Sequence, residues 1–172
     1  MPFWNDVSAE PKLSFRWYST FGYGYHNIRT YCLRSFQKPS FEIAVNEYIW
    51  LNDVEYRPGL VTWNPIEIVI TDAENKDDNN TLKLWNMLKL AGYQNGNINA
   101  PRSALEKSSS TAALGGDIRF TQINARGNPL EEWSLVNPFI SQVNFGQANY
   151  VADEIMSISL TLRYDYAMFK TF

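Results

Sequence analysis

Residues 154–166 read EIMSISLTLRYDY, and from Met156 to Tyr166 every even position is apolar or aromatic while every odd position is polar or charged. Successive side chains of a β-strand point to opposite faces of a sheet, so this alternation builds one face for a core and one for water. Residues 156–166 are therefore predicted to form one long strand in the middle of a sheet. The polar face of that strand is expected to be exposed to water.

The composition of the whole chain favours a single β-rich domain. The chain has 172 residues, 45% of them hydrophobic, with 6 Trp, 10 Tyr and 10 Phe. A domain of this length buries roughly 70% of its unfolded surface, so it needs no metal or disulfide to hold it together. Aromatic residues favour strands and are enriched at protein interfaces. We therefore expect one mainly β domain over residues 1–172 with broad contact surfaces.

Charge and cysteine content argue against several classes of protein. The net charge of -3 argues against a protein that binds nucleic acid by neutralising phosphates. No apolar run reaches the roughly 18 residues of a membrane span, and the opening residues MPFWND lack the basic and apolar regions of a secretory signal. We expect no membrane binding by the monomer. The single cysteine, Cys32, cannot form an internal disulfide and is expected to be a small core residue.

Several other segments are predicted to be strands. They are residues 13–18, 28–36, 41–45 continued by 48–51 after a bend at 46–47, 60–71, 117–124 and 139–145. Residues 130–136 are predicted to be a short strand or a turn segment. Residues 21–25 are predicted to turn the first of these strands into the second, and residues 56–59 and 126–129 are turn signals. Pro65 cannot donate to a strand ladder and marks an edge, a bulge or a strand entry. Seven or eight strands predict an antiparallel β-sandwich or half-barrel.

One helix is predicted to flank the strands, between residues 80 and 92. Asn80 or Thr81 can cap its start and Gly92 can end it. The apolar positions of this range form one stripe that includes Leu82, Leu84 and Leu88, and Lys83 and Lys89 are expected to face water. Residues 94–116 have no period and are predicted to be a loop long enough to serve function or assembly.

Candidate catalytic and metal-binding groups are few. His26 lies beside the predicted turn at residues 21–25, and the sequence assigns it neither a nucleophile nor a carboxylate partner. One His and one Cys cannot complete a zinc site of four protein ligands of the usual kind. The acidic residues before the helix are expected to favour its positive end and not to bind calcium, because the spacing lacks the glycine and glutamate of the calcium loop. These residues are Asp72, Glu74, Asp77 and Asp78.

The neighbouring carboxylates of Glu131 and Glu132 form the last candidate group for chemistry. Adjacent side chains on a strand point to opposite faces, so a charged rim is expected there and not an acid–base pair. No catalytic residue, metal ion or cofactor is predicted for this chain.

Three well-patterned stretches together resemble the tail tube proteins of contractile-tailed bacteriophages, the T-even-like group. Residues 57–73, RPGLVTWNPIEIVITDA, are similar to the hairpin-return segment of that family. Residues 131–146 contain EEWSL, NPFI and VNFG in the order of the family, and residues 160–167, LTLRYDYA, resemble its closing strand. The order and spacing match along nearly the whole chain.

The resemblance implies a structural protein with no catalytic activity. It implies a β-sandwich or half-barrel whose sheets join those of neighbouring subunits into a hexameric β-barrel ring, and rings that stack into the hollow inner tube of a contractile tail. The implied partners are other copies of this chain, a sheath protein outside, baseplate proteins, and the tape-measure protein and genomic DNA in the lumen. The implied location is the tail of the virion, which is assembled in the cytoplasm of the host bacterium.

Physical arguments from the sequence agree with an assembling protein. Long alternating strands leave hydrogen-bonding edges that a monomer must hide, and ring closure removes such edges. Abundant aromatic residues suit broad contacts. An acidic chain suits a conduit, because a cationic lumen would hold DNA back.

The resemblance also gives candidate contact residues. The hairpin at residues 46–59 and the two ends of the chain are expected to reach neighbouring subunits or rings. The candidate contact residues are Asn46, Glu47, Tyr48, Asn52, Asp53, Glu55, Arg57, Phe3, Trp4, Phe169 and Phe172. Polar positions of the long strands are candidates for the lumen surface. They are Glu42, Glu67, Ser157, Ser159, Thr161, Arg163 and Asp165.

Two other functions remain open from the sequence. A baseplate tube initiator or a tube-completion protein would share the fold but form a single ring. A β-sandwich binding module, or a small hydrolase that uses His26, belongs to a different class.

Overall fold

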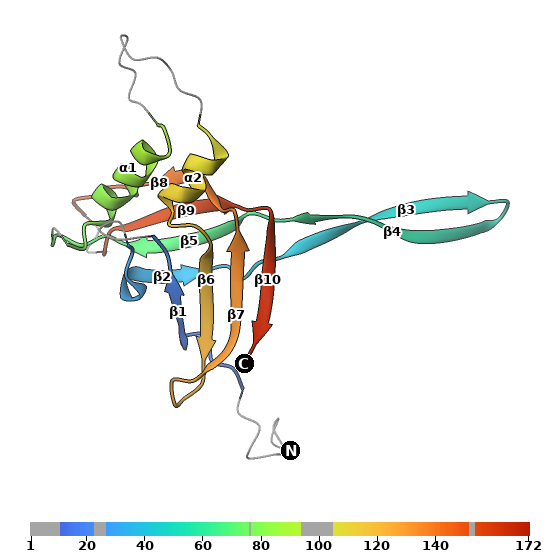
Figure 1. Ribbon diagram of the computed structural model, residues 1–172, viewed down its shortest axis with the longest axis horizontal. Coiled ribbons are helices and arrows are strands. Elements are labelled where there is room, and N and C mark those ends of the chain that lie inside the picture. The colour runs from blue at the N-terminus through green and yellow to red at the C-terminus, as the bar shows by residue number, and fades with distance from the viewer. Residues whose placement is uncertain (1–10, 23–26, 76, 94–104, 152–153) are drawn as a thin grey trace, which may run out of the picture.

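The computed structural model of the chain describes residues 11–22, 27–75, 77–93, 105–151 and 154–172. These residues form ten strands in three antiparallel sheets, two α-helices and a 3-10 helix at Thr30–Cys32 (Figure 1). The predicted β-rich class is confirmed. The prediction of seven or eight strands and one helix was too low, because long alternating segments divide at corners and part of the predicted loop is helical.

Two four-stranded sheets make up the body of the molecule. Sheet A has the order β1 (Trp17–Thr20), β6 (Ile118–Ile123), β7 (Pro129–Val136), β10 (Tyr166–Thr171). Sheet B has the order β2 (Leu33–Phe36), β5 (Ile66–Thr71), β9 (Ser157–Arg163), β8 (Phe139–Asn144). The strands of sheet A run across those of sheet B in Figure 1, and neither sheet is closed.

The core is built from the apolar face of each strand, as alternation requires. The members of the core at 0–1% exposure include Ile66, Ile68, Ile70, Ile158, Leu160, Leu162, Ile118, Phe120 and Leu135. The first six come from β5 and β9, the two central strands of sheet B, and pack in one cluster with the last three, from sheet A. The predicted central place of the 157–163 segment is therefore confirmed. Cys32 is also buried in this cluster, as predicted.

The prediction of one continuous strand from Met156 to Tyr166 was wrong at both ends. Strand β9 covers Ser157–Arg163, and Met156 is 48% exposed. The chain then turns a corner at Tyr164 and Asp165, and Tyr166 begins β10 in the other sheet. The Asp165 backbone N–H donates to the carbonyl of Val136 at 3.0 Å, which fixes the corner. Alternation cannot reveal such a corner, because Tyr164 remains buried across it.

Other predicted boundaries also need correction. The strand predicted at residues 13–18 is β1 at Trp17–Thr20, and it pairs with β6 and not with residues 28–36. Residues 56–59 are not a turn and residues 46–47 are not a bend, because both lie inside long strands. These strands are β3 (Phe41–Trp50) and β4 (Asp53–Trp63). The predicted strand 60–71 is broken before Ile66, so Pro65 marks a strand entry, one of its three predicted roles.

The predicted helix is α1 (Asn80–Leu90), and its cap lies one residue earlier than expected. The Asn79 side chain accepts from the Leu82 N–H at 2.8 Å. Lys83 was expected to face water but is buried, because its Nζ donates to the carbonyl of Asn27 at 3.0 Å. Leu82 was expected on the apolar stripe but is 51% exposed.

A second helix, α2 (Lys107–Ala113), lies within the segment that was predicted to be a loop. It packs beside α1 and near β8. The Thr111 hydroxyl donates to the carbonyl of Pro138 at 3.2 Å. Residues 94–104 of that predicted loop lie outside the described residues.

Candidate assembly surfaces

The third sheet is a two-stranded hairpin, β3 paired with β4, which we call the arm. It projects away from the body in Figure 1, and no other strand of the described residues pairs with it. Every residue from Phe41 to Leu51 is exposed. An isolated two-stranded hairpin is marginally stable at best in water, so an arm of this length is a surface that needs a partner.

Both faces of the arm carry large apolar side chains. Cross-strand partners share a face, and the pair Ile49–Val54 lies on one face while Trp50–Asp53 lies on the other. Trp50 is 78% exposed and Ile49 is 70% exposed. A hairpin that covers a core with one face would keep the other face polar. The arm covers no core, and neither of its faces is polar. This is expected of a strand pair that a partner encloses on both sides.

The arm ends in a strained turn. Leu51 and Asn52 form a two-residue loop, and Leu51 has a φ of 55°. Gly usually takes the positive-φ position of such loops, because a Cβ there collides with the backbone. Leu51 is also 86% exposed, so it keeps an apolar side chain in a strained conformation without burying it.

Contacts within the arm are weak and lie at its surface. Arg57 bonds to Glu55, with 3.0 Å between Nε and Oε1, and its guanidinium lies 5.2 Å from the centre of the Tyr48 ring. Exposed ion pairs contribute about 0–1 kcal/mol. The root is better held, because the ring centre of Trp63 lies 5.1 Å from that of Phe41 and 6.0 Å from that of Tyr164. The arm is therefore attached to the body by aromatic packing at its root and is bare beyond it.

The predicted contact residues of the arm lie together on this bare surface. They are Asn46, Glu47, Tyr48, Asn52, Asp53, Glu55 and Arg57, and all are exposed. Phe169 and Phe172, at the C-terminal end, are 51% and 60% exposed, and the Phe169 ring packs 4.8 Å from the Trp133 ring. Phe3 and Trp4 lie outside the described residues.

Each body sheet also has two unpaired edges. Sheet A ends at β1 and β10, and sheet B ends at β2 and β8. The unpaired N–H and C=O groups of an edge strand are templates for pairing with another chain. All four edge strands are short: β1 and β2 have four residues each, and β8 and β10 have six each. Such short edges can be joined by neighbouring copies without a long extra strand.

Five of the seven predicted lumen residues share one face of sheet B. Glu67 is opposite Thr161 in the register, and Ser157, Ser159 and Arg163 follow on the same face of β9. Sequence reasoning missed Gln142 and Asn144 of β8, which pair with Thr161 and Ser159. Their alternation with Val143 was a usable signal. The face carries hydroxyl and amide groups with one carboxylate and one guanidinium among these residues, so it is nearly neutral.

The other two predicted lumen residues lie elsewhere. Glu42 belongs to β3 in the arm and pairs with Thr62. Asp165 lies at the corner, where its carboxylate accepts from Lys107 Nζ and, at 2.9 Å, from Asn137 Nδ2. The hydrogen bond from Lys107, with a smaller contribution from Asn137, lowers the pKa of Asp165. Asp165 is therefore part of the structure that joins the two sheets and is not on the polar face of sheet B.

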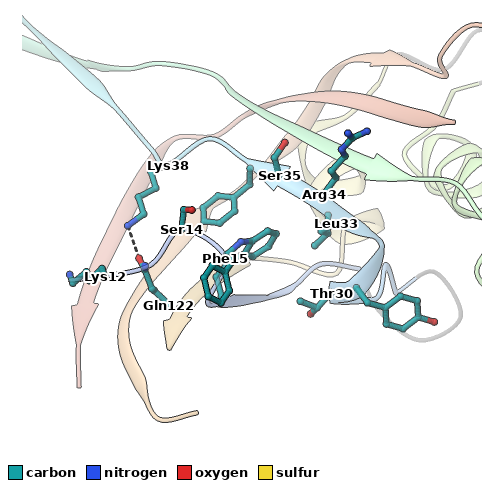
Figure 2. A pocket seen from close by; sticks show the side chains of 12 residues that line it. Lys12, Ser14, Phe15, Thr30, Leu33, Arg34, Ser35, Lys38 and Gln122 are labelled. Atoms are coloured by element: carbon teal, nitrogen blue, oxygen red, sulfur yellow. Dashed lines mark hydrogen bonds between the residues drawn. The ribbon is translucent and has the colours of Figure 1, made fainter. Parts of the chain in front are cut away.

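An open groove of about 810 Å³ lies between the edges of the two sheets (Figure 2). Its aromatic lining includes Trp17 and Phe36, whose ring centres are 4.6 Å apart, and Phe36 stacks on Phe120 at 4.2 Å. Phe15 and Tyr31 also line it and are 72% and 68% exposed. Three cations line it as well: Lys12, Arg34 and Lys38. No prediction from the sequence assigned this groove, because its residues come from distant segments.

A buried carboxylate, Glu131, anchors two of these cations. Lys38 Nζ donates to Glu131 Oε1 at 2.6 Å and to Gln122 Oε1 at 2.8 Å, and Lys12 Nζ also donates to Glu131. Burial alone would raise the pKa of Glu131, but the two ammonium groups outweigh burial and lower it. The expected charged rim was wrong for Glu131, which is 5% exposed. Arg34 has no such partner among the described residues.

The remaining candidates for chemistry are structural or undescribed. Asp72 Oδ1 accepts from the Asn80 N–H at 2.9 Å and so supports the start of α1. Asp78 is buried and accepts from the Tyr31 hydroxyl at 2.7 Å. His26 lies outside the described residues. In the described part of the chain, no group of three or more His, Cys, Asp or Glu side chains could hold a metal ion. None of its helices is long and apolar enough to cross a membrane.

Comparison with known proteins gives structural matches only. Neither the known protein families nor the curated proteins include a sequence match. Among solved structures, the chain is similar to one in the sheath/tube terminator, in the extended state, of an extracellular contractile injection system named PVC. The identity is 16%, the match covers 96% of this chain and 100% of that chain, and the TM-score is 0.70.

Two further matches come from the anti-feeding prophage. A chain in its tube-terminating cap is 17% identical over 98% of this chain and 97% of that chain, with a TM-score of 0.69. A chain in its baseplate, 6-fold symmetrised, is 12% identical over 95% of this chain and 97% of that chain, with a TM-score of 0.67. At these identities the likeness establishes the fold. The chain has the fold of proteins found in contractile injection systems.

Proposed function

We propose that this chain is a structural subunit of the inner tube of a contractile tail. In this proposal it forms rings of six around a lumen, and the rings stack into a tube. The observation that carries the proposal is the fold likeness over the whole chain to proteins of a sheath/tube terminator, a cap and a 6-fold symmetrised baseplate. The bare arm and the four free sheet edges support it, because both need neighbouring copies to cover them.

The partners follow from the same proposal. Sheath protein would surround the tube and baseplate proteins would meet one end of it, because the similar chains occur in a sheath/tube terminator and in a baseplate. The tape-measure protein and genomic DNA would occupy the lumen, and the tube would belong to a virion tail built in the host bacterium. These last partners rest on the resemblance of residues 57–73, 131–146 and 160–167 to the T-even-like tube proteins. The role needs no catalysis.

The polar face of sheet B is the best candidate for the lumen wall. Its near-neutral hydroxyl and amide groups offer little to hold a passing charged polymer. Arg163→Glu, which gives this face two carboxylates, should leave ring formation unchanged, whereas a face buried between subunits would not tolerate it. Loss of rings in that variant would remove this face from the lumen.

Negative-stain electron microscopy of the purified chain tests the main proposal. Rings with a central hole, or stacked tubes, are expected as the concentration rises. Monomers alone at every concentration, with no rings or tubes, would contradict it.

A second candidate function is a ring that ends or starts the tube without polymerising. Two of the similar structures, a sheath/tube terminator and a tube-terminating cap, favour it. The two candidates differ in one measurement. A tube subunit stacks on its own, whereas a terminator stays as single rings and binds only to the ends of a tube made by another protein.

A further inference from the structure

We propose that the groove between the edges of β1 and β2 receives the tip of the arm of a second copy of this chain. The inference rests on the proposed assembly function and deepens it, because it names the two surfaces that meet. It assigns Trp50 and Leu51 to the aromatic lining of the groove and the carboxylates of the arm to its cations.

The groove has the chemistry of a site for an apolar segment with acidic flanks. Trp17 and Phe36 give an aromatic lining, and Phe15 extends into solvent beside them. Lys12, Arg34 and Lys38 carry three positive charges, and Glu131 beneath them carries one negative charge. Arg34 also borders a neighbouring hollow that Glu154 lines. A segment with apolar side chains and acidic flanking residues is therefore favoured over a cationic segment.

The arm supplies that complement. Its strands carry four carboxylates and one guanidinium: Glu42, Glu47, Asp53, Glu55 and Arg57. Three consecutive residues at its tip carry exposed apolar side chains: Ile49, Trp50 and Leu51. Tryptophan is enriched among the residues that dominate binding at interfaces, and its ring attracts cations such as Arg34 and Lys38.

The strained turn is the third argument. Positive φ at a β-carbon-bearing residue costs of order 1–3 kcal/mol, and such strain persists where the surroundings or the function require it. In the isolated chain the side chain of Leu51 is 86% exposed, so its burial does not offset this strain. A leucine that enters an apolar groove of another copy gives a reason for an apolar side chain at a position that suits glycine.

The arm that enters the groove must belong to another copy of the chain. The arm points away from the body, and its tip lies on the far side from β1 and β2 in Figure 1. The groove volume of about 810 Å³ lies in the range of sites that enclose a compact group, roughly 300–1,000 Å³. It is therefore large enough for the tip of a hairpin and too open to be a packing defect.

A charge exchange tests this contact in the full chain. Arg34→Glu and Asp53→Arg should each raise the concentration needed for ring or tube formation by about tenfold, because each places like charges together. The double variant should restore the wild-type concentration. Arg126→Glu, at the exposed 125–128 turn, is the matched control and should have no effect. Assembly is measured by sedimentation velocity and by negative-stain microscopy.

Disulfide trapping gives an independent readout. Leu51→Cys and a tagged Ser14→Cys chain should form a cross-linked heterodimer when mixed under mild oxidation, since Ser14 lines the groove. Leu51→Cys with Arg126→Cys should not. Rings without this cross-link, or single charge variants that assemble normally, would overturn the inference while the proposed function stands. A wild-type chain that never assembles would overturn both.

Discussion

The body and the arm are both built from antiparallel strands, yet the body buries its apolar side chains and the arm leaves them exposed. In β5 and β9 every second side chain is buried, and Ile68 and Leu160 are 0% exposed. In β3, where apolar residues are as frequent, every side chain is exposed. The body therefore obtains its hydrophobic stabilisation within one chain, and the arm leaves its apolar side chains exposed.

The difference has an energetic scale. Burying a large aliphatic side chain contributes about 1.5–3 kcal/mol, and the arm leaves several such side chains in water. Exposed apolar patches of this size usually mark interaction sites. The exposed side chains of the arm are therefore expected to have a role outside the monomer. The body explains why the chain folds, and the arm explains why it should assemble.

Removing the arm should have the largest effect on assembly and little effect on the fold of the body. Ile43 and Val61 are cross-strand partners, so residues 44–60 can be replaced by Asn-Gly, which closes a two-residue hairpin. We expect assembly to be abolished, because the proposed contact surface is gone. The free energy of unfolding of the monomer should change by less than about 0.5 kcal/mol, as for other surface changes.

Electron microscopy and urea unfolding measure the two expectations for the armless chain separately. Rings that persist without the arm would mean that the free sheet edges alone direct assembly. A body that unfolds would mean that the arm supports the core, contrary to its exposure.

A matched pair of alanine substitutions measures how much the body and the arm each contribute to the stability of the monomer. Leu160→Ala in β9 should lower the free energy of unfolding by about 2–5 kcal/mol, because it leaves a cavity in the core. Ile49→Ala in the arm should change it by less than about 0.5 kcal/mol in dilute monomer. Urea denaturation below the assembly concentration measures both. Equal losses at the two sites would show that the arm folds back onto the body in solution.

The pH dependence of stability probes the body beside the groove. The lowered pKa of Glu131 means that the folded chain binds its proton less tightly than the unfolded chain does. Its carboxylate therefore stabilises the fold above the ordinary value of 4.5, and this contribution is lost as the pH falls below 4.5. Glu131→Gln should cost about 1–3 kcal/mol at pH 7 and flatten the acid limb of the stability curve.

Glu132→Gln on the opposite face of β7 is the control for that experiment, since its partner is the hydroxyl of Thr121 at 3.2 Å. Thermal unfolding between pH 3 and pH 7 gives the two curves. A Glu131→Gln curve as steep as that of the wild type would mean that another carboxylate governs acid unfolding.

Alternation predicted the strands well because it reports burial, and burial decided most of the body. Residues 118–123 and 139–144 are strands inside the predicted segments, and Ile118 and Phe120 face inward. Alternation failed at Tyr164, because a corner between two sheets keeps the same side chain in the core. It also failed at residues 56–59, where Pro58 and Gly59 signalled a turn but lie inside β4. A strand pair with no sheet beside it tolerates both residues.

The candidate surfaces were predictable to different degrees. The arm includes the predicted hairpin segment 46–59, although its turn lies at residues 51–52 and not at 56–59. Its assignment as a contact surface stays a prediction. The groove depends on long-range contacts, such as Lys38 with Gln122 and Glu131, that no local pattern encodes. Lys83 shows the same limit, because a carbonyl 56 residues away in the chain decides its burial.

Leu51→Gly gives the smallest expected change and separates the two regions most finely. Glycine relieves the strain at φ 55° but adds freedom to the unfolded chain, so the monomer should change by about 0–1 kcal/mol towards higher stability. Assembly should weaken, because the substitution removes an apolar side chain from the tip. Leu51→Asn, which also accepts positive φ, should behave in the same way. A gain in monomer stability together with a loss of assembly is expected only if the strained Leu51 serves assembly. A variant that gains stability and still assembles as the wild type does would show that Leu51 has no partner in the assembly.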